Sequence, residues 1–144
     1  MALFSLFSAS KAVTAMLIHL CDQRRLLHLD DPVAHYLPEF GRHGKHRITL
    51  RHVLTHRAGI PQIPEALMDV SLLQRPEELL QILCDQKPRW YPGRQLAYHA
   101  LTGGFVLGAV IERVTGKPIR QVLRDAVLGP LGFDAFDYGV PPAR

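Results

Sequence analysis

The feature that most constrains the fold is that no run of apolar and polar residues alternates along the 144 residues. Such alternation is typical of a half-buried strand, whereas here apolar residues recur at helical spacing between prolines and glycines. Nearly every element is therefore expected to be a helix, and the chain by itself is predicted to be mainly α.

About six helices are expected. Ser8 to about Gln23 carries apolar residues around most of its circumference, which is typical of a buried central helix. An acidic pair before Pro32 predicts an N-cap with proline at the first helical position. Thr49 is expected to cap a further helix, and Gly116 to end a long apolar one. The expected helices cover about residues 8–23, 32–37, 50–56, 76–85, 101–115 and 118–128.

The composition is that of an ordinary globular protein, with 47% hydrophobic and 21% charged residues. The formal net charge is +4, but the basic residues form no block, which argues against nucleic-acid binding. No uninterrupted apolar stretch is long enough to cross a bilayer, and the first 21 residues lack the positive start of a secretion signal. The protein is expected to be soluble and cytoplasmic, with an exported form as the less favoured alternative.

Neither the cysteines nor the histidines indicate a metal site. The two cysteines lie far apart without Cys-x-x-Cys spacing, so a disulfide and two reduced thiols fit equally well. His52 and His56 have the spacing of a helical metal pair, and His43 and His46 precede them. No carboxylate or cysteine completes such a site, so neither a metal nor a cofactor is expected.

Lys11 lies inside the apolar segment MALFSLFSASKAVTAMLIHLC, and Ser8 precedes it by three residues. Residues three apart share a helix face, so the two side chains point the same way. A lysine that loses its proton through desolvation can act as general base for a serine hydroxyl one turn away. The alternative is that Lys11 extends its charged end to solvent while Ser8 is an N-cap. On these two residues alone, the alternative is favoured.

Five blocks of sequence, in order, resemble the serine β-lactamase-related superfamily. The resemblance is greatest to class C β-lactamase-like esterases, family VIII carboxylesterases among them, and it includes penicillin-binding proteins. The blocks are LFSASKAVTA, LDDPVAHYLPEF, ITLRHVLTHRAGIP, WYPGRQLAYHALTGGFVLGAVIERVTGKPI and LGPLGF. Their shared order over nearly the whole chain is far more specific than the Ser-x-x-Lys spacing alone.

The resemblance implies roles for several side chains. The serine of Ser-x-x-Lys is the family's nucleophile and the lysine helps to activate it, which implies these roles for Ser8 and Lys11. The tyrosine of a Tyr-x-Asn-type motif is the second acid/base, which implies that role for Tyr98. Residue 100 is alanine where β-lactamases carry asparagine, so an ester substrate is favoured over a β-lactam. Three further residues are candidates for lining a substrate pocket, with core packing as the alternative for the first two: Trp90, Tyr91 and His99.

Members of this family also have elements outside the five blocks. They begin before the Ser-x-x-Lys helix and continue into further strands of a central antiparallel sheet, one of which carries a third motif such as Lys-Thr-Gly or His-x-Gly. Thr115-Gly116-Lys117 has the wrong order, and His43-Gly44-Lys45 lies between the first two motifs. The chain is therefore expected to be the helical lobe plus nucleophile helix of the β-lactamase/transpeptidase-like α/β fold, truncated at both ends, with most of the sheet missing.

A single partial domain is expected over residues 1–144. The nucleophile helix occupies residues 1–25, a helix and loop insert residues 26–95, and the tyrosine motif with the following helices residues 96–144.

Two functions follow from this sequence. The first is a serine hydrolase that transfers the acyl group of a small ester, or of a β-lactam or D-Ala peptide, to Ser8 and then hydrolyses the acyl-enzyme. The second is an inactive family fragment or a helical module that binds a partner, because the strand that completes the oxyanion hole is missing. In this family the oxyanion hole combines the backbone N–H of the nucleophile with an N–H from that strand. Losing one of these two donors costs on the order of a hundredfold in rate. Self-association through the exposed apolar face of the nucleophile helix is a further expectation.

Overall fold

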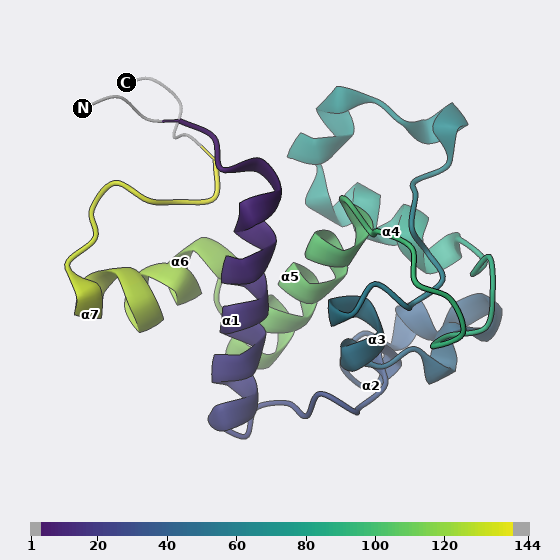
Figure 1. Cartoon of the computed structure of the whole chain (residues 1–144), viewed down its shortest axis with the longest axis horizontal. Coiled ribbons are helices and arrows are strands. Elements are labelled where there is room, and N and C mark those ends of the chain that lie inside the picture. The colour runs from purple at the N-terminus through teal and green to yellow at the C-terminus, as the bar shows by residue number, and fades with distance from the viewer. Residues whose placement is uncertain (1–3, 140–144) are drawn as a thin grey trace.

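Helix α5, Thr102–Thr115, is the element around which the other helices pack. In the computed structural model, which describes residues 4–139, it contacts α1, α2, α3, α4 and α6 (Figure 1). The other helices are α1 Ser10–Gln23, α2 Val33–Tyr36, α3 Leu50–Leu54, α4 Pro76–Asp85, α6 Ile119–Leu123 and α7 Gly129–Leu131. Short 3-10 segments and one π-helical turn join them: Phe7–Ala9, Pro38–Arg47, Glu65–Leu67, Val70–Gln74 and the π turn Arg124–Leu128.

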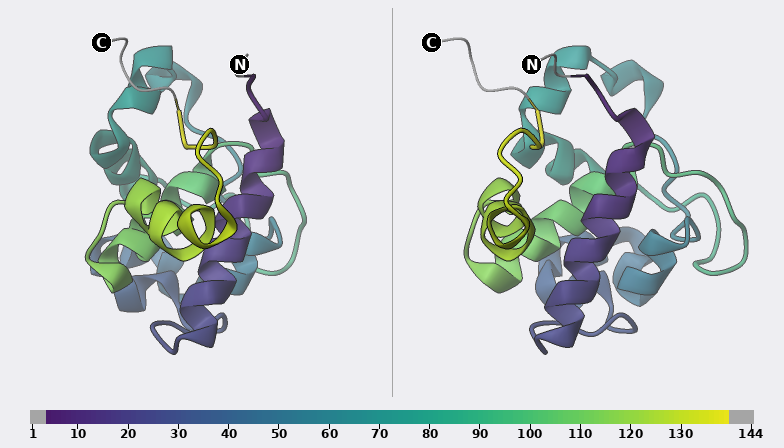
Figure 2. Two further views of the ribbon diagram at one scale, coloured as in Figure 1. Left: turned by 90° about the vertical axis from the view of Figure 1, so that its left-hand side faces the viewer. Right: turned by 60° about the vertical axis from the view of Figure 1, so that its left-hand side comes forward.

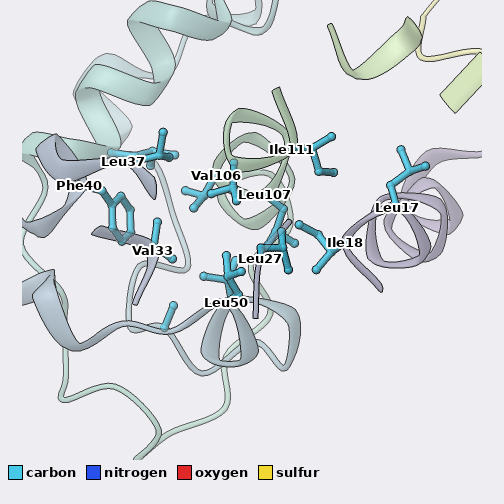
Figure 3. Packing of buried hydrophobic residues seen from close by; sticks show 14 of the residues in the cluster. Leu17, Ile18, Leu27, Val33, Leu37, Phe40, Leu50, Val106, Leu107 and Ile111 are labelled. Carbon is cyan, nitrogen blue, oxygen red and sulfur yellow. The ribbon is translucent and has the colours of Figure 1, made fainter. Parts of the chain in front are cut away.

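The core lies between α1, α5 and the short helices α2 and α3. Figure 3 shows Leu17 and Ile18 of α1 facing Leu107 and Ile111 of α5, and Leu50 of α3 reaching the same cluster. Each of these side chains is buried, and burying one such side chain stabilises the fold by about 1.5–3 kcal/mol. Packing against α5 therefore fixes α1, the helix that follows Ser8.

Helix α1 is buried on one face only, so the prediction of burial around most of its circumference is wrong. Leu17, Ile18 and Cys21 are buried, whereas Ala12 and Met16 on another face are exposed. The exposed positions of α1 are the apolar Ala12 and Met16 and the polar His19 and Gln23, so only part of its exposed face is apolar. The helix ends at Gln23, as predicted. It begins at Ser10, two residues after the predicted start, because a 3-10 turn comes before it.

Several helix ends follow local sequence signals. α4 begins at Pro76 as predicted, and Gly116, at φ 68°, ends α5 in the left-handed conformation. Thr49 caps α3, because its hydroxyl accepts from the His52 N–H and His52 Nδ1 accepts from the Thr49 N–H, both at 3.2 Å. The helix ends at Leu54, before the predicted end, and the change of direction there brings the following residues toward Tyr98.

The predicted acidic N-cap before α2 is wrong. Pro32 is itself the residue before the helix, which has no side-chain cap. Asp30 instead pairs with Arg51, Nε to Oδ1 at 2.6 Å, and Asp31 accepts from the Tyr36 hydroxyl at 2.5 Å. Both carboxylates therefore tie this segment to neighbouring elements instead of stabilising the start of α2.

Residues 4–139 are mainly α, as predicted. They contain one isolated antiparallel bridge, between Pro32 and Thr49, and no named strand. The turn-rich segment 87–95 extends away from the helices (Figure 2).

Within the described part of the chain, no helix combines the length and apolar character needed to cross a membrane. Both cysteines are buried free thiols, which decides between the two alternatives that the sequence left open.

Lys45 is fully buried and fixes the 3-10 segment to the end of α4. Its Nζ donates to the backbone carbonyls of Arg42 at 3.1 Å, Cys84 at 2.7 Å and Gln86 at 2.5 Å. The ammonium also lies 5.5 Å from the centre of the Phe40 ring. Because carbonyls at the end of a helix carry partial negative charge, the lysine satisfies groups that α4 leaves unpaired.

Candidate active site

Ser8 lies in the 3-10 turn that leads directly into α1. The turn is stabilised by Ser10, whose Oγ donates to the Phe7 carbonyl at 2.7 Å. Phe7 has a φ of 46°, a left-handed conformation that costs a residue other than glycine about 1–3 kcal/mol. The uncommon backbone therefore presents Ser8 just outside α1, near the partly positive end of that helix.

The structure brings the three predicted catalytic residues together. Lys11 Nζ donates to Ser8 Oγ at 3.2 Å, and the Tyr98 hydroxyl donates to the same oxygen at 2.7 Å. Lys11 Nζ also lies 5.0 Å from the centre of the Tyr98 ring. Ser8 and Tyr98 are 90 positions apart in the chain, so this convergence is a property of the fold and not of local spacing.

The electrostatics of the trio centre on Tyr98. Hydrogen bonding of Ser8 to the ionised phenol oxygen, followed by the nearby Lys11, lowers the pKa of Tyr98 below its ordinary value. Tyr98 is 52% exposed, so this shift comes from its partners and not from burial. Lys11 is half-buried, which differs from the desolvated lysine expected from the sequence. Its chain runs along α1 while its amine faces Ser8.

His99 is buried, which is inconsistent with its predicted place on a pocket surface. Its ring Nε2 accepts from the Ile60 N–H at 3.2 Å, and its ring Nδ1 donates to the Ala97 carbonyl at 2.6 Å. Burial, partly opposed by that carbonyl, lowers the pKa of His99. The ring therefore supports the backbone next to Tyr98 instead of facing a ligand.

Trp90 and Tyr91 lie in the turn-rich segment before Tyr98. Tyr91 is exposed, and its hydroxyl accepts from Arg47 Nη1 at 2.8 Å. Trp90 is half-buried next to Gly59, and its Nε1 has no hydrogen-bond acceptor among the described residues. No hydrogen bond or ring contact in residues 4–139 joins either aromatic side chain to the Ser8 trio.

Residues between 22 and 36, and between 61 and 102, line two of the hollows on the described surface. One, of about 390 Å³, lies at the end of α1 far from Ser8 and is lined by residues including Asp22 and Arg25. The other, of about 340 Å³, begins at Ala100 and Leu101, immediately after the Tyr98 motif. Its lining combines apolar side chains such as Ile63 and Met68 with the charged Glu65 and Arg89, and neither Ser8 nor Tyr98 is among the lining residues.

His56 also belongs to this site, although the sequence did not predict it there. Its ring lies edge-on to Tyr98, with centroids 5.0 Å apart, and its Nδ1 accepts from the His99 N–H at 3.1 Å. Burial, followed by the charge of Lys11, lowers the pKa of His56. The available signal was its place in the block LTHRAG. Nothing in the spacing of that block indicated a contact with residues 97–99.

In residues 4–139, no three His, Cys, Asp or Glu side chains converge as a metal site.

Comparisons with known proteins match the chain over nearly its whole length. The profile of the family described as Beta-lactamase matches residues 2–144. The Esterase/beta-lactamase LipL of Mycobacterium tuberculosis is 37% identical over 142 residues, which is 95% of this chain and 31% of LipL.

Solved structures agree with this match. A novel penicillin-binding protein homologue from Caulobacter crescentus superposes with a TM-score of 0.88 and 32% identity, covering 95% of this chain and 36% of that one. A family VIII carboxylesterase superposes with a TM-score of 0.89 and 31% identity, covering 94% of this chain and 37% of that one. The chain thus spans about a third of the length of these proteins, as expected for a partial domain. Its helical fold and its sequence over residues 2–144 place it in the Beta-lactamase family.

Proposed function

We propose that this chain carries the nucleophile and acid/base residues of a serine hydrolase that acts on small carboxylic esters. The observation that carries the proposal is the convergence of Lys11 Nζ and the Tyr98 hydroxyl on Ser8 Oγ, at 3.2 Å and 2.7 Å. A serine hydroxyl is a weak nucleophile until a nearby base removes its proton. Two groups that can hold that proton lie within hydrogen-bonding distance.

In the proposed first step, Ser8 Oγ attacks the acyl carbon of the ester while its proton passes to the pair formed by Lys11 and Tyr98. The bond between the acyl carbon and the leaving oxygen breaks, and Tyr98 donates a proton to the departing alkoxide. In the second step a water molecule attacks the acyl-serine and the same pair takes a proton from it. The bond between the acyl carbon and Ser8 Oγ then breaks, the pair returns the proton to Ser8 Oγ, and the carboxylic acid is released. The lowered pKa of Tyr98 supports its part, because an acid/base group works best near the operating pH.

An ester is favoured over a β-lactam for two reasons. Residue 100 is alanine, which cannot supply the hydrogen bond of a side-chain amide to a polar group on a β-lactam. The hollow that Ala100 lines has the apolar side chains of Ile63, Met68 and Leu101 next to the charged Glu65 and Arg89, and its apolar part suits an alkyl acyl group. LipL is described as an esterase/beta-lactamase, and the superposed carboxylesterase takes its name from ester hydrolysis.

The test is intact-mass analysis after treatment of the purified chain with a fluorophosphonate. A single adduct is expected on the wild-type chain and none on Ser8→Ala. Ser71→Ala is the matched control, since Ser71 is an exposed serine that bonds to Asp69 and Arg75 and not to the trio. Tyr98→Phe should slow labelling by about a hundredfold or more.

A folded, monodisperse wild-type chain that takes up no label would contradict the proposal. The chain would then be the inactive member that the sequence offered as the alternative. Labelling that persists in Ser8→Ala would assign the reaction to another residue. Comparing p-nitrophenyl acetate and butyrate with a chromogenic cephalosporin would separate ester from β-lactam turnover.

A further inference from the structure

We propose that His56 is a positioning residue that holds the chain on both sides of Tyr98. The His56 carbonyl accepts from the Ala97 N–H at 3.0 Å, and its ring Nδ1 accepts from the His99 N–H at 3.1 Å. The ring also lies edge-on to the Tyr98 phenol, with centroids 5.0 Å apart and planes inclined by 62°. One residue thus fixes the backbone before and after the tyrosine and limits the movement of its ring.

The backbone of His56 indicates that its imidazole does more than end α3. The His56 N–H donates to the Val53 carbonyl at 3.1 Å, and the Arg57 N–H donates to the His52 carbonyl at 2.7 Å. These are the two bonds of a Schellman helix end, in which the left-handed residue is usually glycine. His56 occupies that position with a φ of 59°. Because glycine adopts this conformation without steric cost, ending the helix alone does not call for histidine.

The hydrogen bonds fix the protonation of the two imidazoles. His56 Nδ1 accepts only while the ring is neutral with its proton on Nε2, and burial together with Lys11 lowers the pKa of His56. His99 completes the support, since it donates to the Ala97 carbonyl and accepts from the Ile60 N–H. The two rings stack with centroids 5.9 Å apart. Two neutral imidazoles therefore form the frame around the tyrosine.

Loss of the His56 ring should act through Tyr98 and not through the substrate. The buried His99 N–H would lose its acceptor, and Tyr98 would lose the ring that borders it. The Tyr98 hydroxyl must stay within hydrogen-bonding distance of Ser8 Oγ, at 2.7 Å in this structure, and a displacement of about 1 Å can cost about a hundredfold in rate.

The experiment measures the pKa of the Tyr98 phenol by NMR, using tyrosine isotope-labelled at the ring carbon that bears the hydroxyl, with Tyr98→Phe assigning the signal. His56→Gly keeps the left-handed backbone and the Ala97 bond but removes the ring acceptor, so the Tyr98 pKa should rise to its ordinary value of about 10. His56→Asn tolerates the same backbone, and its amide oxygen replaces Nδ1 as acceptor. It should therefore keep the lowered pKa.

Arg25→Gly is the matched control for relieving a left-handed residue. Arg25 ends α1 with a φ of 58° and the same pair of bonds, from its own N–H to the Asp22 carbonyl at 2.9 Å and from the Leu26 N–H to the Cys21 carbonyl at 3.0 Å. It lies at the far end of α1, so this change should leave Tyr98 unaltered.

The activity readout rests on the proposed function, whereas the titration does not. The fluorophosphonate rate should fall about 10- to 100-fold in His56→Gly and recover in His56→Asn. If the wild-type chain is not labelled but Tyr98 titrates as predicted, the positioning role stands and the proposed function fails. If labelling and the Tyr98 pKa are unchanged in His56→Gly, the function stands and the positioning role is refuted. Nitrogen NMR of the wild-type ring, if it placed the His56 proton on Nδ1, would refute the role without any variant.

Discussion

Replacing the buried Lys45 with methionine tests whether a lysine that serves no catalytic purpose holds the fold together. Methionine keeps an unbranched chain of similar length and removes the ammonium that donates to three backbone carbonyls. The change is informative because two opposing effects of similar size decide its sign. The ammonium is costly to remove from water, but the carbonyls around it are costly to leave unpaired.

The structure allows the balance to be worked out. The Cys84 carbonyl lies in a buried contact at 2.7 Å, and losing that donor costs about 1–3 kcal/mol. The carbonyls of Arg42 and Gln86 lie in part-buried contacts, so water can replace part of each bond. Loss of the contact between the ammonium and the Phe40 ring adds about 0.5–1 kcal/mol. A hydrogen bond to a charged group contributes about 1.5–3 kcal/mol net of desolvation, so losing one buried bond, two partly replaced bonds and the ring contact should lower the free energy of unfolding by about 2–4 kcal/mol.

The assay is equilibrium unfolding in urea, followed by the fluorescence of Trp90, the one tryptophan in the chain. With a denaturant slope of about 2 kcal/mol per molar, the midpoint should drop by about 1–2 M. Lys117→Met is the matched control, because Lys117 pairs with Asp125 at 2.7 Å in an exposed setting and should change stability by less than about 1 kcal/mol. A Lys45→Met chain as stable as the wild type would refute the reasoning. Desolvation of the ammonium would then cancel all three bonds.

Two further predictions concern stability. Gly59→Ala should destabilise the fold by about 2–4 kcal/mol in the same assay, since φ is +84° and a Cβ there would lie 2.7 Å from the Trp90 carbonyl oxygen. Gly116→Ala, at φ +68° with no atom within 4 Å of its Cβ, should cost only about 1 kcal/mol, and equal losses would count against the steric argument. Burial lowers the pKa of three histidines: His52, His56 and His99. Below about pH 6.5 the unfolded chain binds more protons than the folded one, so stability should fall as the pH falls. Unfolding at pH 7.5 and 5.5 checks this, and a gain on acidification would contradict it.

The features that could be predicted from the sequence are those determined by residues only a few positions apart. The proline at the start of α4 and the glycine after α5 act through their own backbone preferences, and Thr49 acts on an N–H three residues ahead. The spacing of Ser8 and Lys11 is of the same kind, because one helical turn brings their side chains together whatever the rest of the chain does. Asp30 pairs with Arg51, which is 21 positions away, so local sequence signals could not predict this pair.

The remaining parts of the site depend on contacts between distant segments. Tyr98 was identified only from the order of motifs, since nothing in its neighbours shows that it meets Ser8. Lys45 bonds residues 39 and 41 positions away, and burial of its ammonium is visible only once α4 is in place. His99 was expected to line a substrate pocket. The fold instead uses both of its ring nitrogens on the backbone.

The two sides of the candidate site are held by different means, and the difference fits the proposed chemistry. Ser8 is exposed on a turn that follows the strained Phe7, whereas the residues on either side of Tyr98 are bonded to the half-buried His56 and the buried ring of His99. A small shift of the turn changes the position of one reacting atom, the Ser8 oxygen that attacks. A shift of Tyr98 would remove the group that must receive one proton and deliver it to a different oxygen. Proton exchange requires the tyrosine oxygen to be within reach of both atoms in turn, so the more rigid support lies behind the tyrosine.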